Sequence, residues 1–430
     1  MAPWFTFVEE GLALVKRVGL HQLCARLRVS ERRILFAQSQ RYTVLDRSFM
    51  PRFSRFRFDR PQQLAAVLLL ALVAQCAWVF HHQALTGRDY DFARCGREMW
   101  EKPNPLVGYF TSCGNIPDGS LGYRIAGLPL TLQRIVAGED QGTSTWEMRH
   151  ELRYVLVLLH SGFLLIGVFL GGELWWVTRR LFGNAGGFIA LTFYCFSPAV
   201  VHACTYPNNE ILTAFGLYAA LYTAMGVAHA LQGPPRKWRP RIVLLTATLA
   251  FTAASHVAAF LLALVLGIGF MVYLAVGRRG FIIPITVITV VGTLLLLFAA
   301  YDFSPDAFSY FFRSGAGRIW FSLAPARHWF LQFPHACEAL AAVTALVLYL
   351  PTHRSRYFGN TAPLLLALVL FTLVTPGISS EPTLWALPFL FTFIAGVFSD
   401  FLETRYRRLF TIMTAALLFL QVAIGLVSLP

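Results

Sequence analysis

The amino-acid sequence predicts an all-α polytopic membrane protein, on the basis of its composition and its long apolar runs. Of its 430 residues, 56% are hydrophobic and only 13% are charged, whereas an ordinary soluble domain carries roughly a quarter charged residues. A bilayer core about 30 Å thick requires around 20 apolar residues per helix, and runs of that length recur from Leu64 onward. One membrane domain, residues 64–430, is therefore expected in place of several soluble domains.

The first 63 residues form a basic segment, with twelve Lys or Arg against five Asp or Glu. Because the first long apolar run begins only near Leu64, we expect no cleavable signal peptide and a cytoplasmic N-terminus. Apolar residues in the stretch 5–20 roughly follow helical spacing. This pattern fits an amphipathic helix on membrane lipids or a cytosolic docking helix for a membrane protein partner, and both interpretations stay open.

The apolar runs predict about eleven transmembrane spans. Residues 241–276 could form one long kinked helix or two short helices that meet near Ser255 and His256. The predicted ranges are 64–84, 152–177, 185–203, 211–231, 241–255, 257–276, 281–300, 336–350, 361–376, 383–399 and 409–428.

Positive charge alternates along the chain in a way that supports two helices in 241–276. Lys and Arg collect on every second connection if eleven spans are counted, as the positive-inside rule requires. This count places the N-terminus inside, the C-terminus outside, and long connections at 85–151 and 301–335 outside. Because the formal charge of +14 is explained by the N-terminal segment and these short loops, no nucleic-acid partner is expected.

Seven cysteines are spread along the chain without a CxxC pair or metal-ligand spacing. Cys95 and Cys113 share the long outer connection, where an oxidising compartment permits a disulfide, whereas Cys76, Cys195 and Cys337 look like small buried apolar residues. Walker, Rossmann and HExxH patterns are absent from the sequence. These absences disfavour soluble cofactor enzymes, and we expect no cofactor.

The connection 85–151 contains the main candidate for chemistry. It begins with RDYDFARC, which places Asp89 and Asp91 just outside the first span, and seventeen charged residues lie between Arg88 and Arg153. A long polar connection of this kind is expected to be folded and to carry function.

Two features together resemble the GT-C class of membrane glycosyltransferases, in particular the family 39-like group of protein O-mannosyltransferases and aminoarabinose transferases. The first is the acidic pair Asp89 and Asp91 outside the first helix. The second is the stretch 183–222, where a Ser-Pro near the outer end of one helix precedes an acid that opens the next. LTATLAFTAASHVAAFLLALVLGIGF (245–270) is similar to that group's paired short helices around a polar break.

The resemblance implies an inverting glycosyltransferase that moves a sugar from a polyprenyl-phosphate donor to an acceptor at the extracytoplasmic face, in a bacterial inner membrane. A positioned carboxylate would take the proton of the acceptor hydroxyl, with Asp89 as the first candidate and Asp91 as the second. Two other interpretations stay open: the D-x-D pair could bind a divalent metal ion, or the acids could be solvated or paired with Arg88 or Arg94.

Five further residues are candidates for substrate binding. Asn209 and Glu210, preceded by Asn208, lie where the family often has an acid that holds polar groups of donor or acceptor, although helix capping is the alternative explanation. His256 lies at the polar break, where the family often has a basic residue facing the lipid phosphate, but it can also be neutral and hydrogen-bonded between helices. Arg313 and Arg318 could bind phosphate, or belong to an interfacial helix that contacts lipid generically.

Two alternative functions stay open. A non-catalytic GT-C-like scaffold or assembly subunit would fit the basic N-terminal segment and the imperfect acidic motif. A transporter is disfavoured, because the spans carry few central charges and no inverted repeat is visible.

Overall fold

The computed structural model describes residues 60–101, 119–137, 152–301 and most of 303–430. The gaps after residue 301 are 302, 304, 306–307, 310–311, 314–318, 353–357 and 377–381. The predicted amphipathic helix in the first 63 residues, Cys113 and Arg318 therefore lie outside the described residues.

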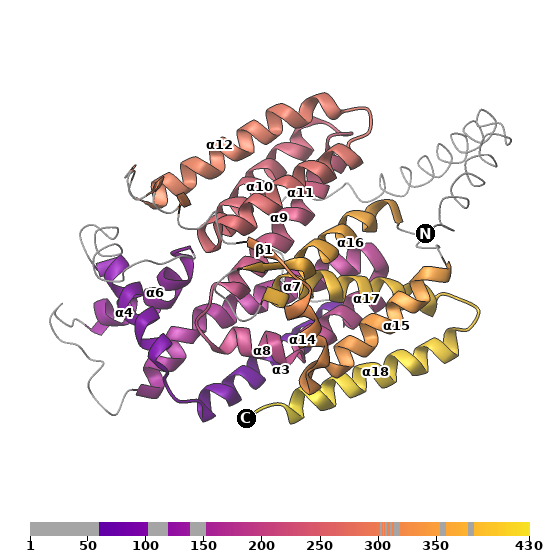
Figure 1. Ribbon diagram of the computed structural model, residues 1–430, viewed down its shortest axis with the longest axis horizontal. Coiled ribbons are helices and arrows are strands. Elements are labelled where there is room, and N and C mark those ends of the chain that lie inside the picture. Colours follow the sequence, from indigo (N-terminus) through magenta and orange to yellow (C-terminus); the bar gives the residue numbers. More distant parts are fainter. Residues whose placement is uncertain are drawn as a thin grey trace, which may run out of the picture. The chain divides into compact units, whose positions relative to one another are not determined.

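The described residues are almost entirely helical (Figure 1). One short antiparallel pair of strands joins β1 (Ile319–Phe321) to β2 (Val374–Pro376), with Trp320 opposite Thr375. The helices are α3 (Arg60–His82), α4 (Gly87–Glu101), α6 (Leu121–Ala137), α7 (Leu152–Cys195), α8 (Pro198–Thr205), α9 (Glu210–Ala230), α10 (Pro235–Ser255), α11 (Val257–Leu274), η3 (Arg279–Phe281), α12 (Ile282–Ala300), α14 (Ala324–Leu331), η4 (Phe333–His335), α15 (Ala336–Thr352), α16 (Phe358–Leu373), η5 (Pro382–Trp385), α17 (Leu387–Leu402) and α18 (Arg407–Val427).

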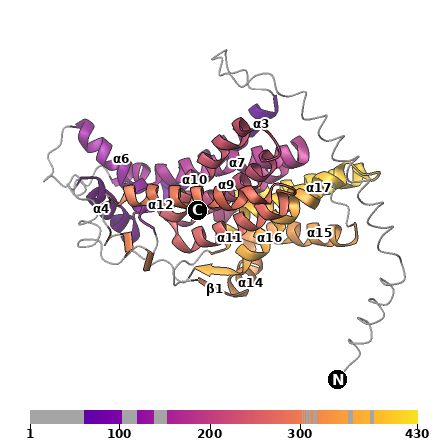
Figure 2. The ribbon, with the colours of Figure 1, turned by 90° about the horizontal axis from the view of Figure 1, so that it is seen from above.

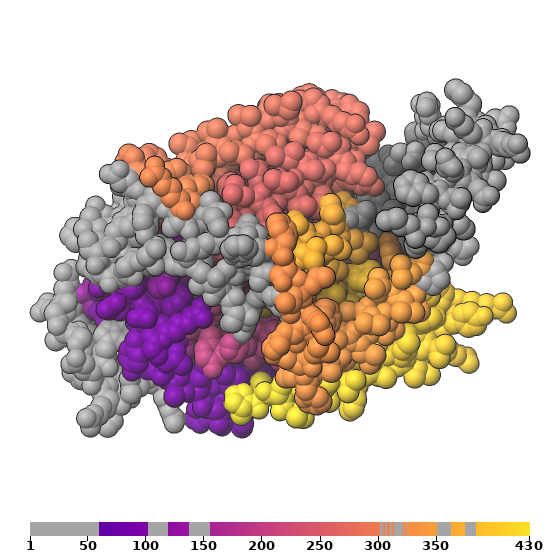
Figure 3. Space-filling view, viewed as in Figure 1, coloured from indigo at the N-terminus to yellow at the C-terminus, as the bar shows by residue number. Residues whose placement is uncertain are grey.

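Length and composition support a multi-pass membrane protein. In the space-filling view α12 and α18 lie on the outside of the described part (Figure 3), and α12 exposes apolar residues such as Ile283 and Val287, as lipid-facing helices do. The number of crossings and the orientation of the termini remain predictions. The described stretches long and apolar enough to span a bilayer are Arg60–His82, Val155–Cys195, Glu210–Ala230, Val257–Leu274, Arg279–Ala300, Phe333–Leu350 and Arg407–Val427, with shorter apolar helices at Pro363–Leu373 and Leu387–Leu402.

The segment 241–276 forms two helices, as the charge alternation predicted. α10 ends at Ser255 and α11 begins at Val257, with His256 in an extended conformation between them (φ −159°, ψ 114°). The imidazole Nδ1 of His256 accepts a hydrogen bond from the backbone N–H of Ala259 at 3.4 Å. His256 therefore caps α11 and satisfies one of the free N–H groups of its first turn.

The two spans predicted at 152–177 and 185–203 have different boundaries in the structure. α7 continues through both, with a kink at Gly183, whose φ of +80° is readily adopted by glycine. The helix then breaks before Pro198, which cannot donate a backbone hydrogen bond. The side-chain amides of Gln75 and Gln421 donate to the freed carbonyls of Cys195 and Phe196 at 3.1 and 2.8 Å, so the break is satisfied without water.

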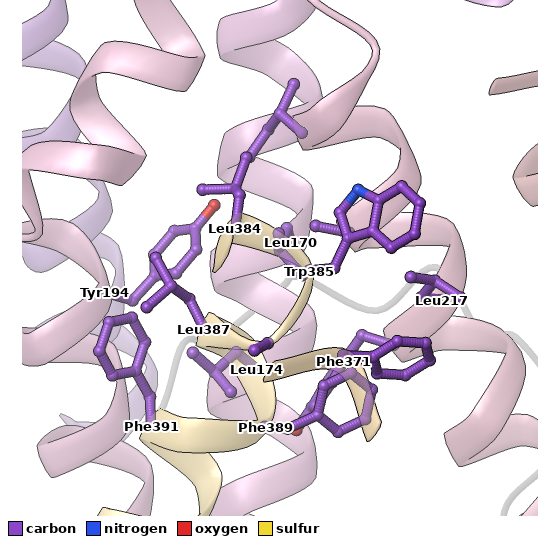
Figure 4. Close-up of a cluster of buried hydrophobic side chains, with 14 of the residues drawn as sticks. Leu170, Leu174, Tyr194, Leu217, Phe371, Leu384, Trp385, Leu387, Phe389 and Phe391 are labelled. Carbon is purple, nitrogen blue, oxygen red and sulfur yellow. The ribbon is translucent and has the colours of Figure 1, made fainter. Parts of the chain in front are cut away.

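The hydrophobic core centres on α17 and the preceding η5. Phe389 and Phe391 of α17 project among side chains of α7, α9 and α16 (Figure 4). Trp385, at the end of η5, is fully buried. α17 thus holds the other helices together through aromatic packing.

The connection 85–151 contains two helices, α4 and α6, which lie side by side (Figures 1 and 2). They cross where Gly96 faces Gly127: a Cβ atom on Gly127 would lie 2.1 Å from the backbone carbonyl carbon of Gly96. Near the same interface Glu101 pairs with Arg97 at 3.0 Å and with Arg134 at 3.1 Å. The prediction that this polar connection is folded is confirmed for its described residues.

The glycine crossing leads to a stability prediction with a matched control. Gly127→Ala adds a methyl group where backbone already lies, so we expect it to destabilise the protein by about 1 to 3 kcal/mol. The same change at Gly87 meets no atom within 4 Å and should be neutral or slightly stabilising. Thermal unfolding in detergent measures both, and equal melting temperatures for the two variants would contradict the tight crossing.

Candidate functional site

Asp89 lies in the first turn of α4 and is fully buried. Its Oδ2 atom accepts hydrogen bonds from the backbone N–H of Thr86 at 2.6 Å and from the Thr86 hydroxyl at 2.7 Å. The Asp89 N–H in turn points at the Thr86 hydroxyl at 3.4 Å. This T-x-x-D arrangement is a capping box, which explains why α4 begins directly after Thr86.

The second oxygen of Asp89 faces the membrane helices. Oδ1 lies 2.9 Å from Nε2 of His160, a fully buried residue of α7 whose ring also packs against Phe80. Burial acts to raise the pKa of Asp89, but the hydrogen bonds from His160 and Thr86 outweigh it, so the pKa lies below its usual value. Asp89 is therefore an ionised carboxylate enclosed at the end of the first span.

Asp91 does not share this environment and is exposed. Residues two positions apart on a helix point about 200° apart, so α4 directs the two carboxylates to different sides. The pair is consequently not arranged to share one metal ion. The partners of Asp89 are Thr86 and His160, and the pairing with Arg88 or Arg94 that the sequence left open is wrong for this residue.

Asn208, Asn209 and Glu210 form the start of α9 and are buried. Asn208 caps the helix, because its Oδ1 accepts from the Ile211 N–H at 3.0 Å. Asn209 instead holds the outer connection: its amide donates to the Gly119 carbonyl and accepts from the Gly122 N–H, both at 3.0 Å. The capping interpretation is thus confirmed for Asn208, whereas the Asn209 side chain makes no capping hydrogen bond.

His256 is buried at the break between α10 and α11 and contacts Trp385 edge to face, with 4.9 Å between ring centroids. Burial lowers the pKa of His256 to about 4, so its imidazole is neutral at physiological pH. A neutral His256 cannot supply the positive charge that a lipid phosphate would require. The indole N–H of Trp385 has no hydrogen-bond partner within the described residues.

Several of these residues come together at one rim of the helix bundle. The Gly119 N–H donates to the Ser255 carbonyl at 2.9 Å, so the start of α6 bridges Asn209 and the residue before His256. Phe312, the residue before exposed Arg313, packs against Val257 and Tyr301 in the same region. The structure therefore gathers the starts of α6 and α9, the α10–α11 break and the Arg313 segment. Phe92 of α4 stacks on Tyr123 of α6 with 4.0 Å between ring centroids, which brings α4 alongside this rim. Arg318 lies outside the described residues.

Within the described residues, no group of three or more His, Cys, Asp or Glu side chains could hold a metal ion, at the rim or elsewhere.

Among the described cysteines, Cys95 is disulfide-bonded, whereas Cys76, Cys195, Cys204 and Cys337 are free and buried. The predicted partner, Cys113, is outside the described residues.

Sequence reasoning missed His160 and Thr86. His160 is an isolated histidine inside the apolar run LVLLHSGF, and an ionisable residue within a span is a functional signal by default. Thr86 was detectable as the first residue of a T-x-x-D capping box. The pairing of His160 with Asp89 joins residues 71 positions apart and has no local signature.

Comparisons with protein-family models and with curated proteins give no match, but solved structures do match. The fold is similar to that of ArnT from Cupriavidus metallidurans bound to undecaprenyl phosphate, with a TM-score of 0.55 and 14% identity over 83% of this chain and 64% of that chain. It is also similar to the Archaeoglobus fulgidus oligosaccharyltransferase in complex with Zn and sulfate, with a TM-score of 0.51 and 12% identity over 84% and 52% of the two chains.

Both of these structures are GT-C glycosyltransferases. The chain spans less than two thirds of the length of either one. At this low identity the likeness establishes the fold alone, so the predicted GT-C-like fold is confirmed while membership of a particular family stays a prediction.

The buried carboxylate leads to a prediction on stability and pH. Asp89→Asn removes an ionised acceptor of three hydrogen bonds and should destabilise the protein by about 2 to 3 kcal/mol at neutral pH. Because the folded-state pKa is lowered, the stabilisation is present above the unfolded pKa of about 3.9 and is lost as pH falls through the folded value. Melting temperatures between pH 7 and pH 3, with exposed Asp91→Asn as the matched control, measure this. A melting temperature equal to that of Asp91→Asn at every pH would contradict it.

His256 leads to a second prediction on how stability depends on pH, in the range between pH 6.5 and 4. A folded pKa of about 4 lies below the unfolded value of about 6.5, so full stability holds above pH 6.5 and declines as pH falls toward 4, by up to about 3 kcal/mol. His256→Asn keeps a capping side chain and removes the titration. We expect the melting temperature of this variant to depend less on pH between 6.5 and 4, and an unchanged slope would show that His256 is not the titrating group.

Proposed function

We propose that the protein is a GT-C-type inverting glycosyltransferase that transfers a sugar from a polyprenyl-phosphate donor to an acceptor hydroxyl at the extracytoplasmic face of a bacterial inner membrane. Two findings support this proposal at the level of the fold. The described part of the chain is a bundle of apolar helices, and it resembles a structure that holds undecaprenyl phosphate.

Asp89 is the observation that carries the proposal. It is a buried, ionised carboxylate at the first turn beyond the first span. Burying such a charge costs free energy, and ionisable residues that are kept in such places are functional candidates by default. A carboxylate has about four lone-pair sites; Thr86 occupies two and His160 occupies one. The remaining site, on Oδ1, is the proposed acceptor of the hydroxyl proton, and it becomes reachable when a substrate opens the rim between α4 and its neighbours.

Groups at the rim are proposed to accept the proton and to stabilise the leaving phosphate in this transfer. The acceptor oxygen forms a bond to the anomeric carbon, its proton passes to Asp89, and the bond from that carbon to the donor phosphate breaks. The phosphate leaves with the bonding electron pair and requires hydrogen-bond donors or positive charge. The indole N–H of Trp385, which has no hydrogen-bond partner among the described residues, and the guanidinium groups of Arg313 and Arg318 are proposed for this, since His256 is neutral. Asn209 and Glu210 are proposed to hold polar substrate groups once the connection moves.

A non-catalytic scaffold is the second candidate, and one observation favours it. Asp89 is fully buried and makes all its described contacts with Thr86 and His160, as a purely structural residue would. In that case the N-terminal segment would bind a membrane protein partner, and the outer helices would present a fixed surface.

Binding and transfer measurements separate the two candidates. We expect the purified protein in lipid nanodiscs to bind a polyprenyl phosphate saturably and to transfer sugar from a matching donor. Asp89→Asn should reduce transfer by about 100-fold or more with binding largely kept, whereas Asp91→Asn should retain transfer. Loss of folding is monitored by the melting temperature of each variant. Absence of saturable polyprenyl-phosphate binding by the folded wild-type protein would favour the scaffold.

A further inference from the structure

A second polar cluster lies at the opposite end of the same helices. It contains Arg180 of α7, Tyr222 of α9 and Arg241 of α10. Arg180 is twenty residues along α7 from His160, which corresponds to about 30 Å of helix. The cluster is therefore separate from the rim that contains Asp89.

Aromatic side chains fix one half of this cluster. The guanidinium group of Arg180 lies over the ring of Trp176, 5.4 Å from its centroid. Trp176 contacts Tyr222 edge to face at 5.6 Å between centroids, and the Tyr222 side chain interacts electrostatically with Arg180. Arg180 is thereby held against α9 while the side chain itself is exposed.

Arg241 completes the cluster from the third helix. Its Nη1 donates to the backbone carbonyl of Gly226 at 2.5 Å, so the guanidinium group is pinned to the end of α9. Arg241 interacts electrostatically with both Tyr222 and Arg180. Two positive groups, one from α7 and one from α10, therefore interact with the Tyr222 side chain of α9.

No carboxylate pairs with either guanidinium group within the described residues. Neither Arg180 nor Arg241 forms an ion pair there, and α10 contains no acidic residue. Glu173 of α7 interacts electrostatically with Tyr222, but it forms no ion pair with Arg180 or Arg241. Two guanidinium groups held together repel each other unless an anion lies between them. Arg is well suited to bind phosphate oxygens in a bidentate manner.

We propose that Arg180, Tyr222 and Arg241 bind the phosphate group of an anionic glycerophospholipid in the leaflet at this end of the helices. An apolar strip on α7 continues from the cluster into the membrane. Leu165, Phe169 and Trp176 are each about half exposed on one face, and Gly172 between them leaves open space. This strip accommodates an acyl chain, which distinguishes a lipid from free phosphate, and Trp176 lies where tryptophan prefers the headgroup region.

The binding assay uses the full-length protein in a neutral detergent and requires no sugar donor, so it is independent of the proposed transfer. Dioctanoyl phosphatidylglycerol, dioctanoyl phosphatidylcholine and inorganic phosphate are titrated separately, with tryptophan fluorescence as the signal. We expect saturable binding of phosphatidylglycerol that is roughly 30-fold weaker in the variant Arg180→Gln/Arg241→Gln. The matched variant Arg278→Gln/Arg279→Gln removes the same charge from the connection between α11 and α12 and should bind as the wild type does.

The variant Arg180→Lys/Arg241→Lys separates a built site from general attraction to positive charge. Lysine keeps the charge but loses the bidentate geometry, so its affinity should lie between those of the wild type and the Gln variant. Wild-type affinity in the Gln variant, equal binding of phosphatidylcholine or of inorganic phosphate, or an equal loss in the Arg278 and Arg279 control would each overturn the proposal. If the double Gln variant does not fold, the single variants are judged by the same criteria.

Discussion

The hydrogen bond between Asp89 and His160 is the interaction on which the arrangement of α4 against the helix bundle depends. It joins the helix that follows α3 to a buried residue of α7, and both side chains are fully enclosed. In a bilayer, polar groups must find their partners within the protein. A carboxylate that entered this position without His160 and Thr86 would lose its charge or expel the helix that carries it.

The same constraint explains the other polar side chains in the bundle. Gln75 of α3 and Gln421 of α18 compensate the break before Pro198, and Asn209 ties the start of α6 to α9. Each of these amides replaces hydrogen bonds that regular helix would have supplied. At the α10–α11 break His256 itself caps the next helix. The start of α9 and the α10–α11 break belong to the rim that we propose as the site of transfer.

The fold was largely predictable from the sequence, whereas the geometry of the site was not. Each range that the apolar runs predicted as a span contains helix in the structure. A polar residue between two apolar runs also predicted the break at His256. The sequence suggested that Asp89 and Asp91 act as a pair, but the helical periodicity of α4 points them to different sides. A partner 71 residues away, His160, helps to keep Asp89 ionised. Long-range pairing of this kind leaves no pattern in a single sequence. The sequence also suggested a positive charge at His256, but burial lowers its pKa to about 4 and keeps the imidazole neutral.

Asp89 is proposed to be the carboxylate that faces a lipid-linked sugar at the extracytoplasmic rim. A structure of the protein determined with a bound polyprenyl-phosphate sugar tests this most directly. We predict that the phosphate lies between the α10–α11 break and the Arg313 segment, with the anomeric carbon on the side of Asp89 Oδ1. Lipid phosphate bound elsewhere, or Asp89 still enclosed with no path to the sugar, would contradict the claim.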